Sequence, residues 1–172
     1  TGTWYERPYA WPDRRDEIAN DLARWAERYE CYFTPGQFKG ARRIEQALPV
    51  RWVWADLDTA NPNKLKVAPR PSIAWESSPG RWQALWRLSQ LVPAAEAAAI
   101  GQRIAYAEGA DKGGWDVTQV LRVPGTRNFK YEGAPLVTLL WNEPSVYEAV
   151  KLGERLPRVA VVAVKEPPKA DQ

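Results

Sequence analysis

Histidine is absent from the 172 residues of this chain. Without histidine the chain cannot build Ser-His-Asp or Cys-His nucleophile systems, and it cannot build histidine-based zinc sites. Any metal ion bound here must therefore sit on oxygen atoms, which favour magnesium or manganese. A cluster of aspartates is consequently the place to look for a metal site.

Cysteine and long apolar runs are also scarce. The single cysteine, Cys31, excludes a disulfide framework within the chain. No apolar run is long enough to cross a membrane or to act as a signal peptide. We therefore expect a soluble protein of the cytoplasm. The formal net charge of +3 permits nucleic-acid binding without requiring it.

The chain length suits one domain with its own hydrophobic core. We expect this domain to span residues 1–164, including an apolar stretch at residues 158–164. The last residues, 165–172, contain Pro167, Pro168 and Lys169, a composition typical of a linker to a downstream region.

Hydrophobic periodicity predicts an α/β domain with a central mixed or antiparallel sheet flanked by helices. Helical spacing of apolar residues predicts helices over residues 13–30 and 93–108 and a short one over 145–152. Alternating patterns predict strands at residues 31–33, 51–58, 72–76, 81–88 and 136–141, with a turn at 77–80 joining two of them into a hairpin. The beginning of the segment 117–130 fits a short helix slightly better than a strand.

The strand at residues 51–58 ends in two acids that share one face, Asp56 and Asp58. Two carboxylates this close repel each other unless a divalent cation or a basic group lies between them. The alternative is that the pair only ends the strand and caps the loop that follows. The metal-binding reading is favoured by position, because a central strand does not tolerate unpaired charges without a function.

Two segments are rich in hydrogen-bond donors. The turn at residues 77–83 offers Ser78, the amides around Gly80 and the side chains of Arg81 and Gln83, a set that suits triphosphate oxygens. The loop at residues 122–130 offers Arg122, Asn128 and Lys130 among its donors. The alternatives are an ordinary hairpin turn and a solvated loop.

The order of these segments resembles that of the archaeo-eukaryotic primase superfamily, and in detail that of plasmid and phage replication primases. The resemblance spans roughly residues 30–131. It rests on four stretches: Tyr32-Phe33-Thr34-Pro35 with the later Arg42-Arg43, Trp54-Ala55-Asp56-Leu57-Asp58, the segment from Glu76 to Trp86, and Trp115-Asp116 with the loop from Arg122 to Lys130.

The resemblance implies a catalytic core related to the RNA-recognition fold, in which Asp56, Asp58 and Asp116 hold Mg²⁺ or Mn²⁺. From their donors we expect the following residues to bind the nucleotide: Ser78, Gly80, Arg81, Gln83, Arg122, Asn128 and Lys130. From their charges we expect Lys39, Arg42 and Arg43 to contact the template. Gln83 stands where many members carry a histidine that touches the incoming nucleotide. Glutamine can donate a hydrogen bond to a phosphate but cannot carry a positive charge.

The sequence therefore predicts a template-dependent nucleotidyltransferase, a DNA primase or polymerase. Its expected partners are a single-stranded DNA template with a primer, NTPs or dNTPs, and a helical primase module or helicase in the same polypeptide. Two alternatives remain open, a non-catalytic module that binds single-stranded nucleic acid and a metal-dependent nuclease that uses the same acids.

Overall fold

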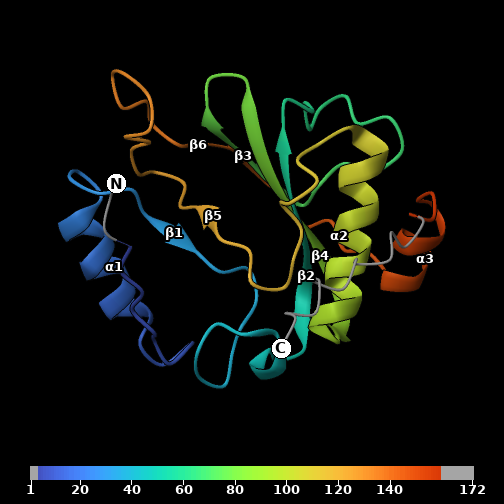
Figure 1. The fold of residues 1–172 in the computed structure, drawn as a ribbon, viewed down its shortest axis with the longest axis horizontal. Helices are drawn as coiled ribbons and strands as arrows, with labels where there is room; N and C mark the ends of the chain where they lie inside the picture. Colours follow the sequence, from blue (N-terminus) through green and yellow to red (C-terminus); the bar gives the residue numbers. More distant parts are fainter. Residues whose placement is uncertain (1–3, 160–172) are drawn as a thin grey trace, which may run out of the picture.

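The computed structural model describes residues 4–159 and is built around a four-stranded antiparallel sheet. The strand order is β2-β4-β3-β6, which confirms the predicted α/β class with a central sheet (Figure 1). The strands are β2 Val50–Asp58, β3 Ile73–Ser78, β4 Arg81–Val92 and β6 Thr138–Asn142. β3 and β4 form the predicted hairpin. The expectation that residues 51–58 form a central strand is wrong, because β2 pairs only with β4 and lies at one edge of the sheet.

Two helices lie on one side of the sheet, α2 Ala94–Glu108 and α3 Ala149–Glu154 (Figure 1). Helix α2 packs closely on β2: a Cβ atom at Gly101 would lie 2.4 Å from the carbonyl oxygen of Trp54. The apolar side chains of β2, β4 and α2 are largely buried and make up the core.

The other side of the sheet carries a second, two-stranded sheet. It pairs β1 Tyr32–Phe33 with β5 Leu121–Arg122 in antiparallel register, and helix α1 Arg15–Trp25 lies beside it (Figure 1). The helix that we predicted at the start of residues 117–130 is therefore wrong. Pairing with the distant Tyr32 and Phe33 prevails over the weak helical spacing of this segment. The short 3₁₀-helix η1 Ile44–Gln46 precedes β2 and lies near the start of α2.

Several element boundaries differ from the predicted ones. Helix α1 ends at Trp25 and buries none of its residues, whereas β4 continues to Val92 by pairing with Val50 across a bulge. Helix α3 begins at Ala149 rather than 145, because the backbone of Tyr147 bonds to β4 at Arg87 and Ser89. The tail, including residues 160–164 of the predicted apolar stretch and the predicted linker, lies outside the described residues.

A buried carboxylate at the end of α2 holds the loop between β2 and β3. Glu108, which is 6% exposed, accepts hydrogen bonds from the backbone N–H groups of Lys66 (2.6 Å), Val67 (2.8 Å) and Ala68 (2.8 Å). These three bonds fix a long loop against the helix. Within residues 4–159 no helix is both long and apolar enough to span a membrane.

Candidate functional site

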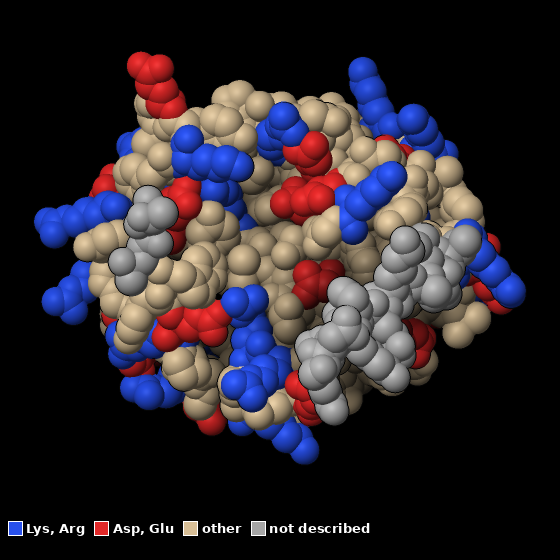
Figure 2. Space-filling view, viewed as in Figure 1, with Lys and Arg blue, Asp and Glu red and all other residues tan. Residues whose placement is uncertain are grey.

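The two acids of β2 lie at its end, on the side of the sheet that carries β1 and β5. Asp56 is the register partner of Gln83 on β4, and Asp58 ends the strand with a left-handed backbone conformation (φ 49°). Figure 2 shows acidic side chains near the middle of the molecule in this view, with lysine and arginine side chains next to them and around the outline.

Asp56 is a carboxylate in a largely desolvated place. Its Oδ2 accepts a hydrogen bond from Gln83 Nε2 (3.0 Å), and its Oδ1 accepts one from the backbone N–H of Asp58 (3.3 Å). Burial raises the pKa of Asp56; the two hydrogen bonds lower it, and the negative charges of Asp111 and Asp58 raise it further. The ionised form is thus disfavoured, and a cation beside this carboxylate would relieve the penalty.

Asp58 already has a cationic partner. Its Oδ1 forms an ion pair with Arg81, and both side chains are 43% exposed. Arg81, predicted to bind nucleotide phosphates, therefore neutralises part of the acidic pair in this structure. An exposed pair of this kind contributes little to stability and exchanges partners readily.

The loop before Asp116 runs along the free edge of β2 at Asp56. The backbone N–H of Asp111 donates to the carbonyl of Asp56 (3.2 Å), and the N–H of Asp56 donates to the carbonyl of Gly114 (3.0 Å). A Cβ atom at Gly114 would lie 2.5 Å from the Cβ of Asp56, so a side chain does not fit there. Glycine at 114 is what lets the loop lie directly against the acid.

Asp116 lies on the same side of the sheet, since its carbonyl accepts a hydrogen bond from the Trp54 indole (3.0 Å). Its carboxylate Oδ1 is engaged by Thr118, through the backbone N–H (2.8 Å) and the hydroxyl (2.5 Å). Within residues 4–159, no three histidine, cysteine or acidic side chains are grouped so as to hold a metal ion. Asp56 and Asp58 supply the hard oxygen donors that Mg²⁺ or Mn²⁺ prefers, and metal coordination by all three acids stays a prediction.

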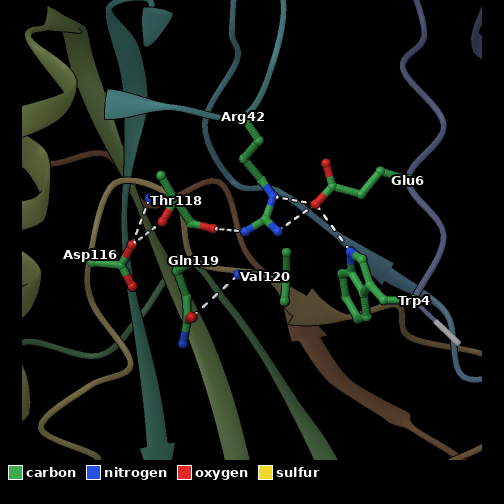
Figure 3. Close-up of polar contacts among 7 residues, drawn as sticks. All are labelled: Trp4, Glu6, Arg42, Asp116, Thr118, Gln119 and Val120. Carbon is green, nitrogen blue, oxygen red and sulfur yellow. Dashed lines mark hydrogen bonds and ion pairs between the residues drawn. The ribbon is translucent and has the colours of Figure 1, made fainter. Parts of the chain in front are cut away.

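Arg42, predicted to contact the template, is engaged inside the protein (Figure 3). Its guanidinium bonds the carboxylate of Glu6 through Nε (2.8 Å) and Nη2, and it donates through Nη1 to the carbonyl of Thr118. Trp4 donates its indole N–H to the same carboxylate (3.1 Å). Arg42 therefore ties the N-terminal segment to the loop that carries Asp116.

Asn128, Gly80 and Ser78, which we predicted to bind the nucleotide, are bonded or buried within the protein. Asn128 is 1% exposed and donates from Nδ2 to the carbonyl of Ser77 (2.7 Å), which fixes the 122–130 loop to β3. The backbone N–H of Gly80 donates to Glu76 (2.8 Å), and Ser78 is buried. Their contact with a nucleotide stays a prediction.

Arg122 is also mostly enclosed, at 8% exposed. It forms an ion pair with Glu30 (3.1 Å), and its guanidinium lies 4.7 Å from the centre of the Tyr32 ring. The Tyr32 hydroxyl donates to the same carboxylate of Glu30 (2.9 Å). By contrast, Lys130, Lys39 and Arg43 are exposed and available to a ligand.

Sequence reasoning missed residues that the fold brings to this region. Asp111 could have been noticed, because it is an acid in the glycine-bearing loop that leads to Asp116. The sequence did not mark Glu30, because its partner Arg122 lies far away in the chain. It did not mark Trp75, because its partner Gln83 lies opposite it on the neighbouring strand.

Comparison with known proteins gives the following matches. The family described as "RepB DNA-primase N-terminal domain" matches residues 36–155. Among solved structures, the AEP domain of the cyanophage S-2L primase-polymerase superposes with a TM-score of 0.65 at 14% identity, covering 86% of this chain and 85% of that one.

The catalytic domain of primase RepB′, solved in complex with initiator DNA, superposes with a TM-score of 0.52 at 21% identity, covering 60% of this chain and 56% of that one. At these identities the structural matches show a shared fold. A search among curated proteins found no significant match.

Proposed function

The chain belongs to the family of RepB DNA-primase N-terminal domains, and from this premise we propose that it is a template-dependent nucleotidyltransferase of plasmid or phage replication. It would extend or initiate strands on single-stranded DNA. The observation that carries the proposal is the placement of Asp56 and Asp58 at the end of β2, with the loop that leads to Asp116 bonded along the same strand.

In this proposal Asp56, Asp58 and Asp116 are the ligands of Mg²⁺ or Mn²⁺. The bound cations would lower the pKa of the attacking 3′-hydroxyl and offset the charge that develops on the phosphates. Asp58 would exchange its partner Arg81 for the cation, which leaves the guanidinium of Arg81 free to bind a triphosphate oxygen. Asp116 would contribute a carboxylate oxygen from the neighbouring loop.

Three exposed cations suit the other substrates. Lys130 follows Asn128, which bonds the Ser77 carbonyl beside the β3–β4 turn, and we propose that Lys130 binds the incoming nucleotide together with Arg81. Lys39 and Arg43 would contact the phosphate backbone of a template strand, in line with the initiator DNA in the similar RepB′ structure. Backbone contacts of this type give binding that weakens with salt and depends little on sequence.

A primer-extension assay with Mg²⁺ or Mn²⁺ tests the proposal. Wild-type protein should lengthen a labelled primer, whereas Asp56→Ala and Asp58→Ala should not, while binding a single-stranded oligonucleotide with nearly unchanged affinity. Shortening of the labelled strand would identify a nuclease instead. Strand binding without any change in strand length, in the wild type and both variants alike, would identify a non-catalytic binding module.

A further inference from the structure

Gln83 lies in the middle of a row of side chains that crosses the central sheet. The strand register places Asp56 on β2 opposite Gln83 on β4, and Gln83 opposite Trp75 on β3. Register partners point to the same face of a sheet and their side chains touch. The side-chain amide of Gln83 therefore links Asp56 to Trp75 in the core.

The hydrogen bonds of Gln83 determine how its amide is oriented. Its Oε1 accepts from the Trp75 indole N–H (3.0 Å) and from the backbone N–H of Arg122 (2.9 Å). Both partners can only donate, so the oxygen must face them and the NH₂ group must face the other way. Nε2 consequently donates to Asp56 Oδ2 (3.0 Å), a carboxylate that can only accept when ionised.

These contacts leave Gln83 enclosed. The residue is 5% exposed, with Trp75 on one side and the β5 backbone at Arg122 above it. Trp75 itself is 1% exposed and packs against the Phe33 ring of β1 (6.0 Å between ring centres). The amide thus connects three parts of the protein: the acid on β2, the core of the sheet and the small β1–β5 sheet.

We propose that Gln83 is a positioning residue, which sets the orientation of the Asp56 carboxylate and holds β5 above it, and that it does not bind the triphosphate. This inference rests on the proposed function, because it assigns Asp56 as a ligand of the catalytic cation. Groups that orient a metal ligand in this way typically change metal affinity or activity by about 10- to 100-fold when removed.

Two variants separate this role from a nucleotide contact. Gln83→Leu removes all three hydrogen bonds, whereas Gln83→Glu keeps the acceptor oxygen for Trp75 and Arg122 and changes only the group that faces Asp56. The second variant retains the contacts to Trp75 and Arg122, and it sets a carboxyl group against Asp56, so that the two acids repel each other unless they share a proton. Gln90→Leu, at an exposed position of the same strand, is the matched control.

The measurements are Mn²⁺ affinity of the protein alone, by electron paramagnetic resonance, and kcat and KM for the nucleotide in primer extension. Gln83→Leu should weaken Mn²⁺ binding at least about tenfold. Both Gln83 variants should lower kcat by a similar factor, with the nucleotide KM within about twofold of the wild type. Gln90→Leu should match the wild type in every measurement.

The opposite pattern overturns the inference. A nucleotide KM that rises tenfold at unchanged kcat and unchanged Mn²⁺ affinity identifies Gln83 as a phosphate contact. Gln83 variants that match the wild type in Mn²⁺ affinity, kcat and nucleotide KM show that the amide does not position Asp56. A wild-type protein that neither binds Mn²⁺ nor extends a primer refutes the proposed function, and the inference falls with it.

Discussion

Replacing Gly114 with alanine should separate the loop of Asp116 from β2. The new Cβ atom would lie 2.5 Å from the Cβ of Asp56 and 3.3 Å from its Cα and backbone nitrogen. The atoms it meets belong to the backbone and the first side-chain carbon of a paired strand, so they cannot move aside as the end of a flexible side chain would. The loop must shift, and the hydrogen bond from Asp56 N–H to the carbonyl of Gly114 lengthens.

The size of the effect follows from the clash. Forcing an extra methyl group into a packed site costs about 1–3 kcal/mol, and weakening a backbone hydrogen bond adds about 1 kcal/mol. For a chain of this length, each kcal/mol lowers the midpoint of thermal unfolding by about 2–4 °C. We therefore expect Gly114→Ala to unfold several degrees below the wild type and to lose most of its primer extension, because Asp56 and Asp116 no longer keep their relative placement.

The neighbouring glycine provides the control. A Cβ atom at Gly113 would meet only Asp111 Oδ1, at an ordinary contact distance of 3.6 Å. Gly113→Ala should therefore leave primer extension unchanged and leave the unfolding midpoint level or slightly raised, because alanine restricts the unfolded chain. Both variants are compared by circular dichroism on heating and by primer extension. Equal midpoints and equal extension rates in Gly113→Ala and Gly114→Ala would refute the argument.

Three further predictions concern other contacts. Glu108→Ala leaves the backbone N–H groups of Lys66, Val67 and Ala68 without their acceptor, and because only Ala68 is buried, the substitution should lower the free energy of unfolding in urea by about 1–3 kcal/mol; an unchanged midpoint would show that water replaces the carboxylate. Arg42→Ala should slow primer extension with little loss of single-strand affinity, whereas Arg43→Ala should weaken that affinity at low salt; the reverse ranking would make Arg42 the template contact. Lys130→Ala should raise the nucleotide KM about tenfold without changing the unfolding midpoint, and superimposable nucleotide titrations would remove it from the site.

The sequence predicted the local parts of the fold. Alternation over residues 51–58 correctly identified a strand that ends in two acids, although this strand lies at the edge of the sheet and not at its centre, and the hairpin at 77–80 was correctly placed. These features depend on neighbouring residues and on turn chemistry, which a single sequence contains. Their role in binding metal or nucleotide stays a prediction.

Contacts between distant segments were not predictable in the same way. The pairing of Tyr32 with Arg122, and that of Asp56 with Gln83, depend on which distant strands become neighbours and in which register. A shift of one residue would turn these side chains to the other face, and these strands have no connecting turn that sets the register as it does in the β3–β4 hairpin. For the same reason Arg42 resembled a free basic residue until the fold brought Glu6 beside it.

The β1–β5 sheet also has a consequence for the order in which the chain folds. The β3–β4 hairpin closes through a two-residue turn, whereas Tyr32 can meet Arg122 only after the intervening strands and α2 have come together. Contacts so distant in the chain carry a large loop-closure entropy and form late. We expect the small sheet to close last and to open first, so that its amides exchange hydrogen faster than those of β4. Such a local opening would uncover Asp56 to water while the central sheet stays folded.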